Sequence, residues 1–164
     1  MGLPTRAGLP DNAAVEDAVI EYISVFCAET QPIELARLRE LALIWMRRMA
    51  DFRPHLAGAV WHGTATKLSD IFIQLFCDDS KSAELALIEH NADYEPRTVP
   101  GFSGGMVDAL SLSSLCSSLG QHIGVHFMVY DYDDLRGALK PDEKGRKPRG
   151  DLAAVEKLVG TAKV

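Results

Sequence analysis

Residues 58–76 read GAVWHGTATKLSDIFIQLF, and this stretch decides the fold. Its first part belongs to a short apolar run over 56–61, which begins two residues earlier and is bounded by turn-forming residues, and this run predicts a buried strand. Its last part is β-branched and aromatic, with apolar side chains at every second position, which predicts another strand over 70–77. The loop over 62–69 contains a Gly-Thr pair. We therefore expect two neighbouring strands joined by a short loop.

Two helices are expected before this stretch. Residues 1–11 lack periodicity and read as a loose arm that ends at a capping residue, Asp11 or Asn12. Apolar residues then recur at steps of three and four over 13–28, which predicts an amphipathic helix. A second stripe, rich in Leu, Trp and Met, begins after Thr30 and continues to about residue 52. Its width predicts a largely buried helix.

Helices and strands alternate after the central stretch. The patterns predict a helix over 81–90, a strand over 94–99, a helix over 106–119 after a Gly-Ser-rich loop, a strand over 125–131 and a short helix ending near 139. This order is typical of an α/β or α+β domain, in which helices cover a small mixed sheet of about four strands. The domain spans residues 1–139, with a helical flank over 12–52 and a sheet core over 56–139.

The C-terminal segment, residues 140–164, is expected to be a charged linker followed by a short helix that begins after Asp151. Lysines and arginines gather in this linker, with acidic residues among them and no aromatic residue for stacking on bases. A solvated linker is therefore favoured over a nucleic-acid contact.

Composition narrows the functional classes. The chain has 164 residues, 17 basic and 23 acidic side chains and a formal net charge of -6, which argues against a large footprint for DNA or anionic lipid. Its apolar stretches end well short of the ~20 residues that a membrane span needs. Three isolated cysteines, Cys27, Cys77 and Cys116, form no C-x-x-C pair and fit a reducing compartment. We expect a cytoplasmic protein.

The central stretch carries a recognisable motif. Gly63-Thr64 is followed by Ser69-Asp70 at the start of the next predicted strand, and a further apolar strand lies over 124–131. In this arrangement, over roughly residues 40–135, the chain resembles the nucleotidyltransferase superfamily that includes DNA polymerase β, kanamycin nucleotidyltransferase and the small bacterial nucleotidyltransferases. In that superfamily a Gly-Ser pair precedes a Ser-Asp-x-Asp motif, and a later strand supplies a third carboxylate.

The resemblance implies a set of binding residues. Gly63 and Thr64 would approach phosphates, together with Lys67, Ser69 and Asp70, and Asp70 would bind Mg²⁺ if a metal site survives. Magnesium prefers oxygen ligands, and two carboxylates one residue apart on a strand point to the same side, where they can hold a metal–triphosphate complex. The residues alone leave a second role open for Asp70, which is to cap a turn.

The motif departs from the family pattern at two carboxylate positions. The residue that should supply the second carboxylate is Phe72, and the third acidic position falls near His126. A nitrogen donor suits magnesium poorly. We therefore expect a domain that has lost or weakened nucleotidyl transfer and acts as a nucleotide-sensing or protein-interaction module. A partner protein or a homodimer would use the helical face, and the resemblance to the small bacterial type implies a helical partner.

Two enzymatic alternatives stay open. The first is an active metal-dependent nucleotidyltransferase, in which Asp131 or Glu95 joins Asp70 to rebuild the acidic site. The second is a serine hydrolase, because residues 101–105 read GFSGG and match the G-x-S-x-G pattern around Ser103. A hydrolase would also need an acid, Asp108 or Asp131, and a base, His122 or His126. The histidines and cysteines show no spacing typical of zinc ligands.

Overall fold

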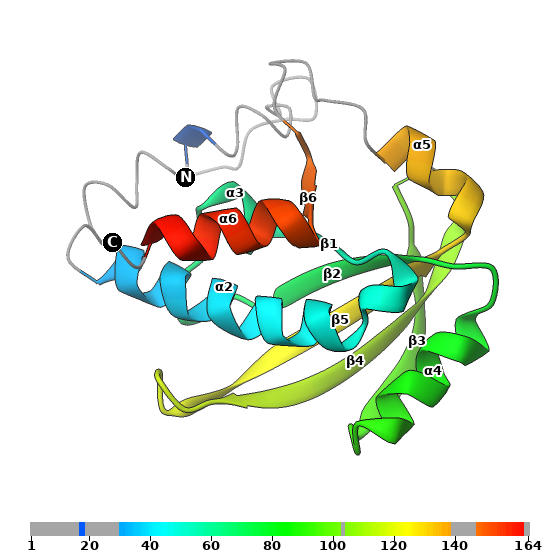
Figure 1. Ribbon diagram of the computed structural model, residues 1–164, viewed down its shortest axis with the longest axis horizontal. Helices are drawn as coiled ribbons and strands as arrows, with labels where there is room; N and C mark the ends of the chain where they lie inside the picture. Colours follow the sequence, from blue (N-terminus) through cyan, green and yellow to red (C-terminus); the bar gives the residue numbers. More distant parts are fainter. Residues whose placement is uncertain (1–16, 19–29, 103, 139–146, 163–164) are drawn as a thin grey trace, which may run out of the picture.

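The computed structural model describes residues 17–18, 30–102, 104–138 and 147–162. In this part of the chain a mixed sheet of six strands has the order β3-β4-β5-β2-β1-β6, and helices pack against it (Figure 1). The expected class, a mixed sheet covered by helices, is confirmed, and the expected count of about four strands was too low. The strands are β1 His55–Ala57, β2 Ile71–Phe76, β3 Tyr94–Pro100, β4 Met106–Cys116, β5 Gln121–Tyr130 and β6 Arg149–Asp151.

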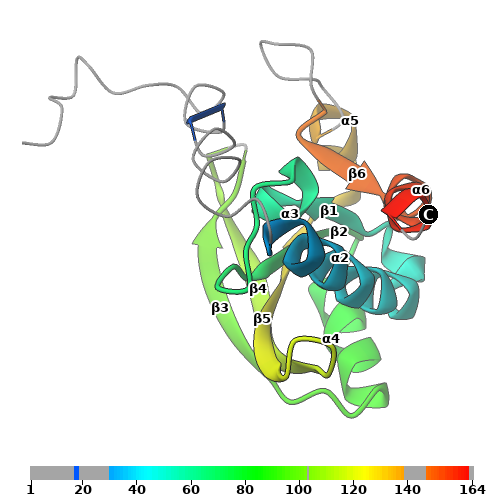
Figure 2. The same cartoon turned by 90° about the vertical axis from the view of Figure 1, so that its left-hand side faces the viewer.

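The helical elements lie mostly on one side of this sheet. They are α2 Gln31–Arg48, α3 Gly58–His62, α4 Ser80–Glu89, α5 Leu135–Ala138 and α6 Leu152–Ala162, with 3₁₀ turns η2 Ala50–Phe52 and η3 Tyr132–Asp134. Figure 2 shows α2, α4 and α6 on the same side of the curved sheet. Their buried side chains join one cluster with the sheet, in which the Trp45 and Phe127 rings meet edge to face at 5.8 Å. We call this side of the sheet the helical side and the other side the open side.

The strand pairing decides what the open side carries. β2 and β5 run parallel, and the other neighbouring pairs are antiparallel. Because side chains alternate along a strand, Ile71, Ile73 and Leu75 enter the helical core while Phe72 and Gln74 face the open side. The register places Phe72 opposite His126 and places His126 opposite Ser111. One row of the sheet therefore joins these three side chains.

The expected strand over 56–61 is wrong beyond Ala57. β1 ends there, and Gly58 adopts a left-handed conformation, with φ of 71°, at the first position of α3. A short apolar run does not distinguish a strand from one turn of buried helix, and the glycine redirects the chain into the helix. Val60 is then fully buried. Consequently Gly63 and Thr64 follow a helix rather than end a strand.

The expected helix over 106–119 is also wrong, because β4 occupies residues 106–116. Leu110 and Leu112 are buried among the helices, and the intervening Ser111 faces the open side. This two-residue alternation is the strand period. A turn at 117–120, with Gly120 at φ of 67°, returns the chain into β5.

The two ends of the chain differ in how much of them the structure describes. The expected helix over 13–28 lies outside the described residues, apart from Asp17 and Ala18, which are helical. At the other end β6 pairs with β1, and α6 packs on α2. The sheet thus continues into residues 140–164, the segment expected to form a linker and a C-terminal helix. The expected strands over 94–99 and 125–131 and the helix over 81–90 are confirmed as β3, β5 and α4.

Candidate functional site

Asp70 lies directly before β2, beside Gly124 of β5. A Cβ atom added to Gly124 would lie 2.8 Å from Cγ of Asp70, inside van der Waals contact. The missing side chain at position 124 therefore makes room for the carboxylate over the neighbouring strand. This is a close approach that requires glycine for its size rather than for its conformation.

The Asp70 carboxylate is hydrogen-bonded to an imidazole. Nε2 of His126 donates to Oδ2 of Asp70 at 2.9 Å, and Nδ1 of His126 lies 2.8 Å from Oγ of Ser111. With Nε2 protonated, the Ser111 hydroxyl donates to Nδ1 of the neutral ring. The side chain of Asp70 is 48% exposed and that of His126 is 24% exposed. We refer to these three residues as the Asp70–His126–Ser111 line.

Phe72 covers the same imidazole. The Phe72 and His126 rings are stacked, with centroids 5.0 Å apart and planes inclined by 22°. On its other flank Phe72 meets Gly58, where an added Cβ would lie 3.4 Å from Cδ2 of the ring. Phe72 is 39% exposed. A stacked pair of rings thus stands on the open side of the sheet between two glycines, with Asp70 beside it.

The loop residues expected to bind phosphate are held by the protein itself. The amides of Gly63 and Thr64 both donate to the carbonyl of Ala59, and Thr64 is buried. The amide of Lys67 donates to Oε1 of Glu34, at 2.9 Å. Oγ of Ser69 accepts the amide of Thr66. The four loop residues Gly63, Thr64, Lys67 and Ser69 thus bond to other parts of the loop and to α2 and α3, whereas the fifth predicted site residue, Asp70, bonds to His126.

Buried Gln31 fixes the same loop from α2. Its amide nitrogen donates to the carbonyl of Gly63 at 3.1 Å and to that of Ala65 at 2.7 Å. Gln121, at the start of β5, donates to the carbonyl of Lys67 at 2.5 Å. These hydrogen bonds tie the loop to both α2 and β5.

Metal chemistry finds little support at Asp70. Among the described residues, no group of three or more His, Cys, Asp or Glu side chains is placed to hold a metal ion. Glu95, one of the two acids that could rebuild the site, lies on β3 opposite Ser111 and pairs with Arg97 at 3.4 Å. Asp70 therefore meets the imidazole of His126, and Phe72 and His126 occupy the two positions at which the resemblance led us to expect carboxylates.

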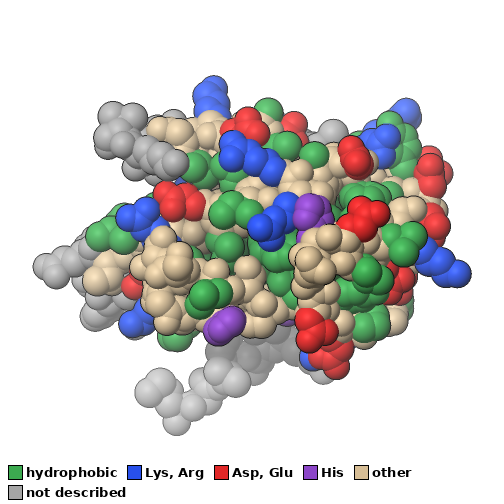
Figure 3. All heavy atoms as spheres, turned by 60° about the horizontal axis from the view of Figure 1, so that its bottom comes forward, with side chains coloured by type: hydrophobic (Ala, Val, Ile, Leu, Met, Phe, Trp, Pro, Cys, Tyr) green, Lys and Arg blue, Asp and Glu red, His purple; other side chains and the backbone are tan. Residues whose placement is uncertain are grey.

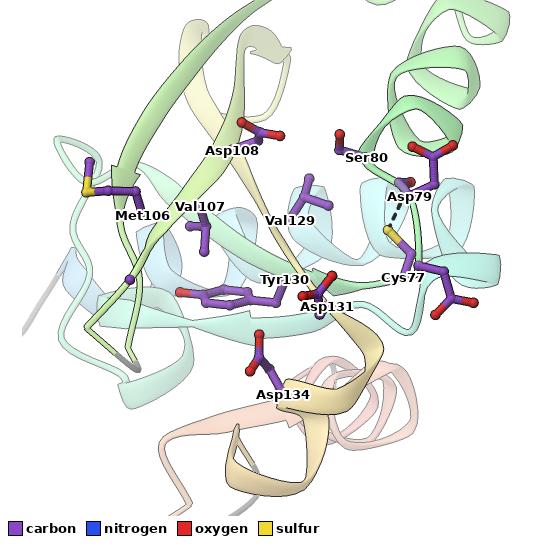
Figure 4. A pocket seen from close by; sticks show the side chains of 12 residues that line it. Cys77, Asp79, Ser80, Met106, Val107, Asp108, Val129, Tyr130, Asp131 and Asp134 are labelled. Atoms are coloured by element: carbon purple, nitrogen blue, oxygen red, sulfur yellow. Dashed lines mark hydrogen bonds between the residues drawn. The ribbon is translucent and has the colours of Figure 1, made fainter.

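Asp131, the other acid that could rebuild the site, lies in a cavity at the opposite end of the parallel strands (Figure 4). Asp70 is level with Gly124, so seven residues of β5, roughly 20 Å, separate it from Asp131. The cavity measures about 480 Å³ and contains the carboxylates of Asp78, Asp79, Asp108, Asp131 and Asp134.

Two less polar groups also line this cavity. The Cys77 thiol donates to the carbonyl of Asp79 at 3.4 Å, and its burial raises the pKa of the thiol. Burial also raises the pKa of Tyr130, whose ring stacks on Phe76. The cavity wall therefore combines exposed carboxylates with buried side chains that stay neutral at ordinary pH.

The Asp70–His126–Ser111 line has the residue types of a hydrolase triad but lacks a further requirement. Ser111 lies in the middle of β4, which is paired with β3 on one side and β5 on the other. Backbone amides in such a position bond to neighbouring strands and do not form an oxyanion hole. Ser103, the other candidate nucleophile, lies outside the described residues. Acyl transfer at Ser111 is therefore not supported.

The surface mixes charges of both signs. On the face drawn in Figure 3, basic and acidic side chains of the described residues are interspersed, with hydrophobic side chains between them. None of the helices in the described part of the chain has the length and hydrophobicity needed to cross a lipid bilayer.

Comparisons with known proteins return partial matches. No protein-family model matches the sequence. Leucine--tRNA ligase 2 of Saccharolobus solfataricus is 33% identical over 81 residues, which are 48% of this chain and 8% of that protein. A crystal structure of the Cid1 poly(U) polymerase with MgGTP bound overlaps 58% of this chain and 32% of its own, at 16% identity and a TM-score of 0.39. The chain thus spans less than a tenth of the ligase and about a third of the polymerase chain.

Sequence reasoning missed three residues of the site. Gly58, Gly124 and Ser111 are small, so none stands out by its own chemistry. The signal for Ser111 was the alternation of Leu and Ser over 110–113, which indicates a strand with a polar face. The glycines carried no such signal, because their role depends on Phe72 and Asp70, which only the strand pairing brings near them.

Proposed function

We propose that this chain is a nucleotidyltransferase-like domain that binds a nucleotide on the open side of the sheet, at Asp70, and does not catalyse metal-dependent nucleotidyl transfer. One observation carries the proposal: the Asp70 carboxylate is bonded to His126, at 2.9 Å, rather than facing a second carboxylate. Gly63, Thr64, Lys67 and Ser69 are proposed as the neighbouring part of the binding site.

The strand register supports this interpretation. Position 72 faces the same side as Asp70, and position 126 is its direct partner on a parallel strand. Carboxylates at both positions would surround a divalent cation together with Asp70. Phenylalanine and histidine occupy them instead, and they stack on each other. The arrangement of strands therefore suits the family, while the side chains lack the negative charge that Mg²⁺ needs.

Two measurements test this proposal. The midpoint of thermal unfolding is followed with each of the four ribonucleoside triphosphates, with MgCl₂ or with EDTA, because a ligand that binds the folded state raises that midpoint. In parallel, release of pyrophosphate from the same triphosphates measures transfer. We expect stabilisation by at least one nucleotide and no pyrophosphate above the background of the Asp70→Asn variant. Stabilisation by none of them would refute nucleotide binding, and Asp70-dependent pyrophosphate release would refute the loss of transfer.

A protein-interaction module is the second candidate, and one observation favours it. On α4, Leu85 is 60% exposed and Ile88 is 55% exposed. They leave apolar area on the helical side that a partner or a second copy could cover. Light scattering of the wild type and of Leu85→Lys/Ile88→Lys tests for a dimer. An unchanged monomer mass for both proteins would refute self-association through α4.

A further inference from the structure

Resting on the proposed nucleotide site, we propose that the open side holds its ligand by the base, which stacks on Phe72, and that no divalent cation takes part. The base donates N–H groups to Asp70. Guanine fits this arrangement best among the common bases, because two adjacent N–H donors on its edge can face one carboxylate. The ligand class is therefore a guanine nucleoside or nucleotide recognised through its base.

Shape is the first argument. The Phe72 and His126 rings are stacked, with centroids 5.0 Å apart, so the imidazole covers one face of the Phe72 ring. On its other flank the Phe72 ring meets Gly58, which carries no side chain to cover it. A planar ring system can stack on this second face of Phe72, as bases do on the aromatic side chains of RNA-binding sheets.

Exposure is the second argument. Phe72 is 39% exposed although it belongs to β2, an interior strand of the described sheet whose next residues are buried. Phe76, on the same side of the sheet, is fully buried against Tyr130. The protein therefore covers one aromatic side chain of the open side and leaves the one beside Asp70 accessible.

Charge is the third argument. Within the described part of the chain, Asp70 accepts from the imidazole of His126 through Oδ2, and Oδ1 can accept further hydrogen bonds; the Asp70 side chain is 48% exposed. A carboxylate without a bound cation repels a triphosphate and attracts N–H donors. The uncharged, donor-bearing part of a nucleotide is consequently the part that suits this position.

Binding of guanosine and GTP to the full chain tests the proposal by isothermal titration calorimetry, in MgCl₂ and in EDTA. We expect guanosine to bind within roughly threefold of GTP, with affinities that EDTA leaves unchanged. Inosine, which lacks the exocyclic amine, should bind at least roughly threefold more weakly than guanosine, and Asp70→Asn should abolish that difference. Stacking on an aromatic side chain predicts that Phe72→Leu weakens binding by roughly fivefold or more.

Matched variants separate the site from general effects. Phe72→Trp keeps a stacking surface and should retain binding. Tyr132→Leu removes another exposed aromatic ring, 44% exposed and covered by Arg53 at 4.1 Å, and should leave binding unchanged. Binding of GTP that is lost in EDTA, or equal binding by wild type and Phe72→Leu, would overturn the inference and leave nucleotide binding standing. Absence of binding by every nucleoside and nucleotide would overturn both.

Discussion

Replacing Phe72 and His126 by aspartate should create a metal site on the open side of the sheet. In the Phe72→Asp/His126→Asp variant, three acids would lie on neighbouring backbone positions. Residues 70 and 72 are about 7 Å apart along β2, and residues 72 and 126 are direct partners across strands about 4.8 Å apart. Carboxylate side chains at these distances can reach one cation at about 2.0–2.6 Å.

The size of the effect follows from mass action. If the variant binds Mn²⁺ with a dissociation constant near ~1 mM, then 10 mM Mn²⁺ stabilises the folded state by about 1.4 kcal/mol. For a chain of this length that corresponds to a rise of roughly 3–6 °C in the unfolding midpoint. Without metal the variant should be less stable than the wild type, because three like charges repel one another and the stacked ring pair is lost.

Thermal unfolding with and without Mn²⁺ measures this shift, and the bound ion can be counted by electron paramagnetic resonance. The control is Phe72→Asn/His126→Asn, which makes similar changes in volume without adding charge. We expect a metal-dependent shift in the carboxylate variant and none in the control or the wild type. A folded carboxylate variant without a shift would refute the claim that Phe72 and His126 occupy the positions of metal ligands.

Three further predictions concern stability and reactivity. Gly124→Ala should lower the free energy of unfolding in urea by about 1 kcal/mol, because its methyl group displaces Asp70 from His126. The same substitution should have close to no effect in an Asp70→Gly background, and equal effects in both backgrounds would contradict the contact. Burial lowers the pKa of His55, whose Nδ1 donates to the carbonyl of Arg53. The free energy of unfolding should therefore fall as the pH drops through about 6.5, by at most about 1.4 kcal/mol per pH unit. The variant His55→Asn should flatten this pH dependence, whereas the control His90→Asn, at an exposed position, should leave it unchanged. Burial raises the pKa of the Cys77 thiol, so Cys77 should react slowly in the folded protein. In a Cys27→Ser/Cys116→Ser background at pH 8.5, iodoacetamide should label the folded protein at least roughly tenfold more slowly than the urea-unfolded protein, and equal rates would contradict the burial of Cys77.

The elements that could be predicted from the sequence are those with a strong period. The stripe of α2 and the alternation of β2 each place apolar side chains on one face, and both elements formed as expected. The two errors share a cause. Residues 56–61 form a short apolar run that suits helix and strand alike, and within 106–119 the strand alternation is clear only over 110–113. Pairing of β4 with β3 and β5, and the left-handed Gly58, settled these segments through contacts distant in sequence.

The candidate site shows the same division. Asp70, Phe72 and His126 could be assigned to one site because a motif orders them along two predicted strands, and the register of β2 with β5 places Phe72 and His126 opposite each other. Hydrogen-bond partners could not be predicted in this way. Ser111 reaches His126 only because β4 pairs with β5, and that strand was expected to be a helix.

The environment of the Asp70 carboxylate is supplied by its immediate neighbours. If Phe72 had replaced an acid without other changes, Asp70 would hold a negative charge with no cation to balance it. The imidazole of His126 stabilises that charge by a hydrogen bond instead, because it donates to Asp70 from one nitrogen while its other nitrogen meets Ser111. Gly124 leaves the space that this bond requires. The positions of Asp70, His126, Ser111 and Gly124 thus depend on one another, so a substitution at any of them should disturb the hydrogen bond to Asp70.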